Sequence, residues 1–222
     1  MYLTTISLCE TQFGFEGYMI KESTLTITIF NTPILSRVFH YLAAFIMRLV
    51  GWHVDGKLPD LPKFILIGAP HTSNWDFVLF LGVIFTLRAN VRFMGKSEIF
   101  RFPIGWFFRY CGGVPVDRKK STGLVEQMVK ASKESDQFIL TIAPEGTRHH
   151  VMEWKRGFYH IAKNAGLPIV MAIVDGKHKT VHIMDQVFQP TDDIEADMKA
   201  IKGVFEGVTG INSRRKYITL ES

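Results

Sequence analysis

The chain has 222 residues, 47% of them hydrophobic, and carries a formal net charge of +5. This length and apolar content predict one folded domain with a substantial core and argue against a disordered chain. The positive charge favours anionic partners, either phosphorylated molecules or acidic lipid headgroups, and the sequence lacks any signature of a nucleic-acid-binding fold.

The two cysteines, Cys9 and Cys111, do not have the spacing of metal ligands. The sequence therefore predicts neither a disulfide framework nor a zinc site. Residues 1–17 lack the cationic start, the continuous apolar core and the clear cleavage site of a secretory signal. We expect the protein to work in a reducing compartment.

Residues 1–32 are assigned no role, although the alternation over residues 24–30 is typical of a strand. Residues 33–52 predict a strongly apolar helix, in which Arg37 and Arg48 argue against a membrane span. An apolar stripe and these two arginines fit an amphipathic helix that associates with the membrane interface. The stripe consists of Leu35, Val38, Phe39, Leu42, Phe45, Ile46 and Leu49. Packing of this helix on its own domain is the alternative.

Residues 64–68 form an apolar run of aromatic and β-branched side chains, which predicts a strand buried on both faces. Gly-Ala-Pro ends the run. Thr72 or Ser73 is then expected to cap a helix that carries Asp76 in its first turn. His71 is thereby placed in the turn between the strand and the helix.

The five-residue separation of His71 and Asp76 would rotate them by about 140° within one helix. With His71 just before the helix, the two side chains can meet. A carboxylate that binds one imidazole nitrogen fixes the tautomer and leaves the other nitrogen to accept a hydroxyl proton, as in a general base with an orienting partner. The alternative is a solvated histidine beside a capping box formed by Ser73 and Asp76.

Strands and helices alternate along the rest of the chain. Strands are expected within residues 91–95, 112–120, 138–143 and 167–174. Helices are expected after a cap at Ser121, over residues 154–165 up to a C-cap at Gly166, and after a capping box formed by Asp192 and Glu195. This alternation predicts an α/β fold in which a mixed, mostly parallel sheet is flanked by helices.

The strand over residues 138–143 runs into a second polar turn, Pro-Glu-Gly-Thr-Arg at residues 144–148. Gly146 permits a tight turn with outward backbone N–H groups, and Arg148 has the geometry to bind a phosphate through two hydrogen bonds. The alternative is an ordinary surface turn with a Glu–Arg pair.

The blocks HTSNWD, GGVPVDR, PEGTR and LPIV, in this order and at these separations, resemble the glycerolipid acyltransferase family typified by 1-acyl-glycerol-3-phosphate acyltransferase. The resemblance covers roughly residues 64–174. It implies an active site at the strand ends, with His71 as the base and Asp76 as its orienting partner. It also implies a set of residues that bind the acceptor's phosphate or polar head: Lys96, Arg118, Glu145, Gly146, Thr147, Arg148 and Lys155.

Acyl transfer from a thioester also needs a donor for the oxyanion and an apolar groove for the chain. The sequence leaves the oxyanion donor open between Lys96 and backbone N–H groups. The groove is left open between the aromatic residues 106–108 and the helix that begins near Phe77. The whole aromatic segment, residues 96–109, suits either a membrane interface or a helix over the core.

The resemblance implies an enzyme that moves a fatty acyl group from acyl-CoA or acyl carrier protein to a lysophosphatidate-like lysolipid in phospholipid biosynthesis. No metal or cofactor is expected, and no Ser or Cys nucleophile, because the acceptor hydroxyl itself can attack the thioester and GxSxG is absent. The expected partners are the thioester donor, the lysolipid and an anionic membrane surface, but not nucleic acid. Departures at Met171-Ala172 and His149-His150 leave the acceptor open.

We divide the chain into a segment of unclear role at 1–32, an interfacial helix at 33–52 and an acyltransferase domain at 53–222. The expected location is peripheral or monotopic on the cytoplasmic face of a bacterial membrane. Two other functions are considered, an acyl-thioesterase that uses water as the acceptor and a non-catalytic lipid-binding module.

Overall fold

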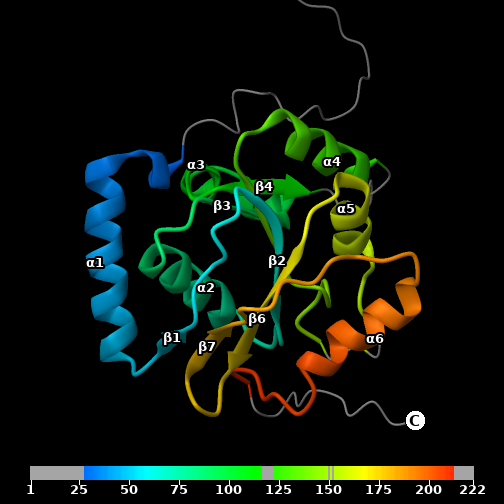
Figure 1. Cartoon of the computed structure of the whole chain (residues 1–222). Coiled ribbons are helices and arrows are strands. Elements are labelled where there is room, and N and C mark those ends of the chain that lie inside the picture. Colours follow the sequence, from blue (N-terminus) through cyan, green and yellow to red (C-terminus); the bar gives the residue numbers. More distant parts are fainter. Residues whose placement is uncertain (1–27, 117–122, 150, 152, 213–222) are drawn as a thin grey trace, which may run out of the picture.

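The structure, a computed structural model, describes residues 28–116, 123–149, 151 and 153–212 (Figure 1). Cys9, Arg118, Ser121 and most of the 1–32 segment lie outside the described residues, as does the end of the strand expected over 112–120. Within them, seven strands form one mixed sheet in the order β1-β7-β6-β2-β5-β3-β4. The predicted α/β architecture is confirmed.

Five strands run parallel to one another in the centre and on one side of this sheet. They are β2 (Lys63–Ala69), β3 (Val91–Lys96), β4 (Gly113–Val116), β5 (Phe138–Ile142) and β6 (Ile169–Asp175). The short strands β1 (His53–Asp55) and β7 (Thr180–Ile183) pair with each other in parallel, and β7 runs antiparallel to β6. Because β2 and its neighbours β5 and β6 are parallel, the chain segments that follow these three strands all emerge at one edge.

Helices cover both faces of the sheet (Figure 1). On one face α4 (Leu124–Glu134), α5 (Gly157–Ala165) and α6 (Ile194–Val204) close the largest apolar cluster. On the other face lie α1 (Pro33–Leu49), α2 (Trp75–Thr86) and α3 (Gly105–Tyr110), together with the 3-10 turns η2 (Ile29–Asn31) and η3 (Ser97–Phe100). The sheet is therefore buried on both sides, which explains its uninterrupted apolar strands.

Helix α1 packs on α2 and also leaves an apolar face exposed. A methyl group on Gly82 of α2 would lie 2.7 Å from the sulfur of Met47, so the Met47 side chain packs directly on this glycine. His40 of α1 contacts the backbone oxygen of Thr86 through Nδ1 at 3.0 Å, at the carboxyl end of α2. The exposed apolar side chains of α1 are Ile34, Leu35, Val38, Tyr41, Leu42, Phe45, Ile46 and Leu49. Among the described helices, none has the length and hydropathy that a membrane crossing requires.

Several predicted helix starts were wrong by a few residues. Helix α2 begins at Trp75 with Asn74 in the N-cap position, and the Ser73 hydroxyl accepts the Trp75 N–H at 3.2 Å instead of capping the helix. Helix α4 follows Gly123, whose φ of 84° is a left-handed conformation that favours glycine. The C-cap at Gly166 is confirmed, with φ of 67°.

The capping box at the start of α6 was also wrong, by one residue. Asp193 caps this helix by accepting the Ala196 N–H at 3.0 Å. Glu195 instead forms an ion pair with Arg156 of the preceding loop, at 2.6 Å. At the other end of the chain, the strand predicted over residues 24–30 does not include residues 29 and 30, which belong to the 3-10 turn Ile29–Asn31, and residues 24–27 lie outside the described residues.

Candidate active site

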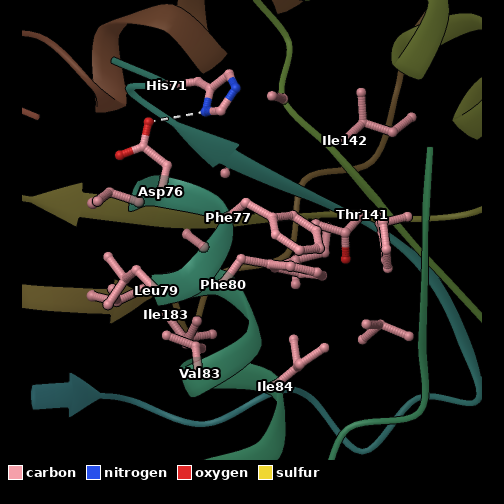
Figure 2. A pocket seen from close by; sticks show the side chains of 18 of the residues that line it. His71, Asp76, Phe77, Leu79, Phe80, Val83, Ile84, Thr141, Ile142 and Ile183 are labelled. Atoms are coloured by element: carbon pink, nitrogen blue, oxygen red, sulfur yellow. Dashed lines mark ion pairs between the residues drawn. The ribbon is translucent and has the colours of Figure 1, made fainter. Parts of the chain in front are cut away.

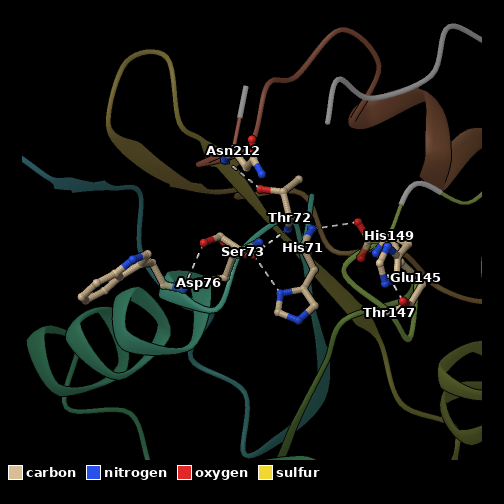
Figure 3. Close-up of polar contacts among 9 residues, drawn as sticks. His71, Thr72, Ser73, Asp76, Glu145, Thr147, His149 and Asn212 are labelled. Atoms are coloured by element: carbon tan, nitrogen blue, oxygen red, sulfur yellow. Dashed lines mark hydrogen bonds and ion pairs between the residues drawn. The ribbon is translucent and has the colours of Figure 1, made fainter. Parts of the chain in front are cut away.

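The two polar turns of the sequence meet because β2 and β5 are neighbouring parallel strands. The turn after β2 carries His71, and the turn after β5 carries Glu145. The backbone N–H of His71 donates a hydrogen bond to Oε1 of Glu145 at 2.8 Å (Figure 3). Two segments that are 74 residues apart in the chain thus form one site at the edge of the sheet.

The predicted contact between His71 and Asp76 is present. Nδ1 of the imidazole lies 2.9 Å from Oδ2 of Asp76 (Figure 2). The same carboxylate oxygen accepts the backbone N–H groups of Thr72 at 2.6 Å and Ser73 at 2.7 Å. Because Oδ2 is an acceptor for three donors, the ring proton belongs on Nδ1 and Nε2 keeps its lone pair.

His71 has the exposure that a general base needs. Its side chain is 29% exposed, whereas that of Asp76 is buried. A buried carboxylate that holds one ring nitrogen fixes both the tautomer and the orientation of the imidazole. The arrangement can therefore take a proton from a hydroxyl that reaches Nε2.

Glu145 is buried, at 5% exposure, whereas a side chain that binds phosphate directly would be accessible to the ligand. Burial raises the pKa of Glu145 above its ordinary value, and the hydrogen bond from the His71 backbone opposes that shift. Within the described part of the chain, neither Oε2 of Glu145 nor Oδ1 of Asp76 has a hydrogen-bond partner. The site thus contains two buried carboxylate oxygens with unused acceptor capacity.

An apolar cavity of about 200 Å³ opens beside the His71–Asp76 pair. Figure 2 shows Phe77 and Phe80 of α2 directed into it, with Thr141 on the facing wall. Gly68 of β2 also lines the cavity, and a methyl group there would meet no atom within 4 Å. The sequence suggested two possible linings for the acyl groove, residues 106–108 or the helix that begins near Phe77. The cavity is lined by α2 and the sheet, and residues 106–108 do not line it.

The structure places the remaining residues of the second turn beside the site. Gly146 has φ of 64°, and the stem of Lys155 lies so close that a methyl group on this glycine would be 2.8 Å from Cδ of Lys155. The Thr147 hydroxyl accepts the His149 N–H at 3.2 Å, and Arg148 is exposed. The turn thus carries the exposed Arg148 and has the Lys155 side chain packed on Gly146, two cations of the kind that can bind an anionic group.

Lys96 has no contact to this cluster among the described residues. Lys96 ends β3 at the same edge of the sheet, and its ammonium pairs with Glu98 at 2.8 Å. That hydrogen bond holds the pKa of Glu98 below its ordinary value. The Gly146 N–H donates to the backbone oxygen of Ala143, so it is not available to an oxyanion. The choice of oxyanion donor between Lys96 and other backbone N–H groups stays a prediction. Arg118 lies outside the described residues.

No three His, Cys, Asp or Glu side chains of the described ranges come together as metal ligands. The expectation that the chemistry needs no metal or cofactor stays a prediction. One contact at the site was missed from the sequence. The hydroxyl of Thr72 accepts the backbone N–H of Asn212 at 3.1 Å, across 140 residues, and no local pattern signals it.

Comparison with known proteins agrees with the fold and with the motifs. The family model described as Acyltransferase matches residues 53–174. The 1-acyl-sn-glycerol-3-phosphate acyltransferase of Streptococcus pneumoniae is 30% identical over 63% of this chain and 55% of its own length. The enzyme of that name from Haemophilus influenzae is 24% identical over 69% of this chain and 65% of its own length.

A solved structure shows the same fold. The crystal structure of the 1-acyl-sn-glycerophosphate acyltransferase from Thermotoga maritima has a TM-score of 0.60 and 20% identity, and the match covers 78% of this chain and 77% of that one. The chain spans between half and two thirds of the length of these two curated relatives. The family match extends over more than half of the chain and includes both polar turns, which confirms the resemblance seen in the motifs. The chain belongs to the acyltransferase family.

Proposed function

We propose that this protein transfers a fatty acyl group from acyl-CoA or acyl carrier protein to the hydroxyl of a lysophosphatidate-like lysolipid, in phospholipid biosynthesis. The observation that carries the proposal is the His71–Asp76 pair, joined at 2.9 Å beside an apolar cavity. The names of the relatives, 1-acyl-sn-glycerol-3-phosphate acyltransferases, support this class of acceptor.

In the proposed reaction, Nε2 of His71 accepts the proton of the acceptor hydroxyl while the hydroxyl oxygen bonds to the thioester carbonyl carbon. The C–S bond of the tetrahedral adduct then breaks, and the leaving thiolate takes the proton back from Nε2. Asp76 keeps its bond to Nδ1–H and stabilises the imidazolium formed between these steps. The two substrates and this histidine account for every bond and proton, so we propose no resident cofactor.

We propose that Arg148 and Lys155, with Arg118 and Lys96, bind the phosphate of the acceptor at the turn that includes Gly146 and Thr147. Glu145 is proposed to shape this pocket from behind, because a carboxylate facing a phosphate would repel it. Its hydrogen bond to the backbone of His71 supports that role. The apolar cavity is proposed to take the fatty acyl chain.

Membrane attachment is proposed through the exposed apolar face of α1. Arg37 and Arg48 lie on the same helix and are exposed, so they can contact anionic headgroups while the apolar side chains enter the interface. We propose a peripheral or monotopic location on the cytoplasmic face of a bacterial membrane, whose leaflet is rich in anionic lipid.

The catalytic proposal is tested by His71→Ala. Removal of a positioned general base is expected to lower kcat by about 10²-fold or more. The matched control is His178→Ala, because His178 also pairs with an aspartate, Asp175, at 2.6 Å, but its side chain is exposed and does not line the cavity. The control is expected to keep full activity in an assay that separates acylated lipid from free fatty acid.

Three results would contradict the proposal. Unchanged transfer by the His71→Ala variant would rule out this histidine as the base. Production of free fatty acid in place of acylated lipid, with a lysolipid present, would instead identify a thioesterase. Vesicle binding without consumption of any thioester donor would identify a lipid-binding module.

Membrane binding is tested by co-sedimentation of the Arg37→Gln/Arg48→Gln variant with anionic vesicles at low salt. Each basic residue near such a surface contributes about 1 kcal/mol, so the double variant should bind about 30-fold more weakly. Lys130→Gln/Lys133→Gln on α4, on the other face of the sheet, is the control and should bind as the wild type does. Wild-type protein that stays in the supernatant would overturn the attachment.

A further inference from the structure

After α6 the chain returns to the catalytic turn through residues 208–212, which we name the return segment. Its start is fixed by Phe205, a fully buried residue whose ring packs against Trp154 at 5.3 Å between centroids. Ile211 packs on the apolar cluster between α2 and the sheet. The family model ends at residue 174, so the return segment lies outside the matched range.

The return segment bonds directly to the residue that follows the proposed base. The backbone N–H of Asn212 donates to the hydroxyl of Thr72 at 3.1 Å (Figure 3). Thr72 is 5% exposed, and its own N–H donates to Oδ2 of Asp76 at 2.6 Å. One threonine therefore connects the return segment to the carboxylate that orients His71.

Two glycines allow the return segment to pass between β6 and the catalytic turn. Gly176, just after β6, donates its N–H to the backbone oxygen of Thr209 at 2.7 Å. A methyl group on Gly176 would lie 2.3 Å from the backbone oxygen of Gly210. A methyl group on Gly210 would lie 2.6 Å from the Thr72 hydroxyl and 3.1 Å from Cγ of Pro70. Because real Cβ contacts are almost never below 3.0 Å, a side chain at Gly176 would displace the backbone of the return segment, and one at Gly210 would displace Thr72 or the return segment itself.

We propose that the return segment holds the catalytic turn in its reactive position, with Thr72 and Gly210 as positioning residues for His71. The proposal rests on the proposed function, in which His71 is the base. The turn is then fixed on two sides, by Glu145 on the His71 N–H and by Asn212 on the Thr72 hydroxyl. A displacement of about 1 Å at a catalytic group can lower a rate by about 10²-fold, so such support has a large effect on turnover.

The return segment should act on kcat and leave KM nearly unchanged. None of residues 208–212 lines the apolar cavity, and the proposed phosphate-binding side chains belong to other turns. A shift of the turn therefore reduces the fraction of molecules in which Nε2 meets the hydroxyl, without removing a contact to either substrate.

The test compares four variants of the full chain in the transfer assay. Thr72→Val keeps the shape but removes the hydrogen-bond acceptor, and we expect a loss of about tenfold in kcat with KM within about twofold. Thr72→Ser keeps the hydroxyl and should restore kcat to within about threefold of the wild type. Gly210→Ala should lose about 10²-fold. Gly203→Ala in α6, where a methyl group meets no atom within 4 Å, is the matched control and should keep full kcat.

A second measurement does not depend on the reaction. Hydrogen exchange of the Thr72 and Ser73 amides, which donate to Asp76, should be about tenfold faster in Thr72→Val and Gly210→Ala than in Gly203→Ala, at equal melting temperature. Wild-type kcat in Thr72→Val, or unchanged exchange in both variants, would overturn the positioning role. Absence of transfer by the wild type would overturn the proposed function instead. If Gly210→Ala does not fold, the Thr72→Val and Thr72→Ser pair decides.

Discussion

Two buried aspartates, one on each face of the sheet, differ in how completely their oxygens are used. Asp197 in α6 accepts hydrogen bonds at Oδ2 from the Tyr159 hydroxyl and the Thr191 N–H, both at 2.6 Å, and at Oδ1 from the Thr191 hydroxyl at 3.0 Å. Asp76 accepts three N–H groups at Oδ2, and its Oδ1 has no partner within the residues that the structure describes.

The electrostatics of the two regions follow this difference. Burial alone would raise the pKa of Asp197, but the bonds from Tyr159 and Thr191 outweigh it and hold the pKa below its ordinary value. Burial, together with the neighbouring Asp197, raises the pKa of Tyr159 to about 12. At the site, Glu145 has one unpartnered oxygen and a raised pKa. Both oxygens of the Asp197 carboxylate accept hydrogen bonds, whereas Asp76 and Glu145 beside His71 each keep one oxygen without a partner among the described residues.

The largest loss of activity is expected for Asp76→Asn, which tests the comparison of the two aspartates. An amide in place of the carboxylate favours the wrong imidazole tautomer, so kcat should fall by about 10³-fold. The fold should persist, which circular dichroism would verify. Activity close to that of the wild type would show that the pair does not orient the base, and the two aspartates would then not differ in role.

The next effect is expected at Glu145. Glu145→Leu removes the acceptor of the His71 N–H and should lower kcat by about ten- to a hundredfold through a displaced turn. Glu145→Gln retains an oxygen at that place and should stay within about threefold of the wild type. Equal losses in the two variants would show that the charge is required and not the hydrogen bond.

The raised pKa of Glu145 also predicts how the stability of the protein depends on pH. Because the pKa of Glu145 is raised in the folded state, its contribution to stability is fully present below the ordinary pKa of glutamate and is lost as pH rises through the raised value. Glu145→Gln removes this loss. Its melting temperature relative to the wild type should therefore increase from about pH 4 to about pH 8, and a constant difference would contradict the raised pKa.

The site region also differs from the Asp197 region in having an open cavity beside it. Gly68→Val would project a side chain into the open cavity and should shift the ratio of kcat/KM between long-chain and short-chain acyl donors about tenfold toward the short ones. Gly68→Ala should give a smaller shift. Gly157→Val at the start of α5, where a methyl group also meets no atom within 4 Å, is the control and should not change the ratio.

The smallest change in activity is expected at Asp197. Asp197→Ala removes the acceptor of the Thr191 N–H and one of the two acceptors of the Tyr159 hydroxyl, which costs about 1–3 kcal/mol. The melting temperature should fall by about 3–10 °C, while kcat at 25 °C stays within about twofold. A selective loss of kcat without a loss of stability would reverse the assignment of the two aspartates.

The central part of the fold could be predicted from the sequence because its signals are local. The apolar runs that became β2, β3, β5 and β6 are buried on both faces, and the turn after β2 set His71 beside Asp76 as expected. Strands β1 and β7 were missed. They have three and four residues, and polar side chains such as Asp55 and His182 face each other across them at 3.0 Å, so no apolar run marks them.

The parts of the site that escaped prediction depend on contacts between distant segments. The hydrogen bond from the His71 N–H to Glu145 could not be predicted, because it depends on β2 and β5 lying side by side in the sheet. The bond between Asn212 and Thr72 spans 140 residues and involves a backbone group, which has no signature in the sequence.

Helix α2 has α1 against one side and the apolar cavity against the other, and its first turn carries Asp76. The N-terminal helix and the space for the acyl chain are therefore separated by the thickness of a single helix. Replacing residues 33–49 with an unrelated membrane anchor would have to reproduce the fit of Met47 against Gly82. Without that contact we expect α2 to relax outward, so exchanging the N-terminal helix would also change the size of the cavity that is proposed to take the acyl chain.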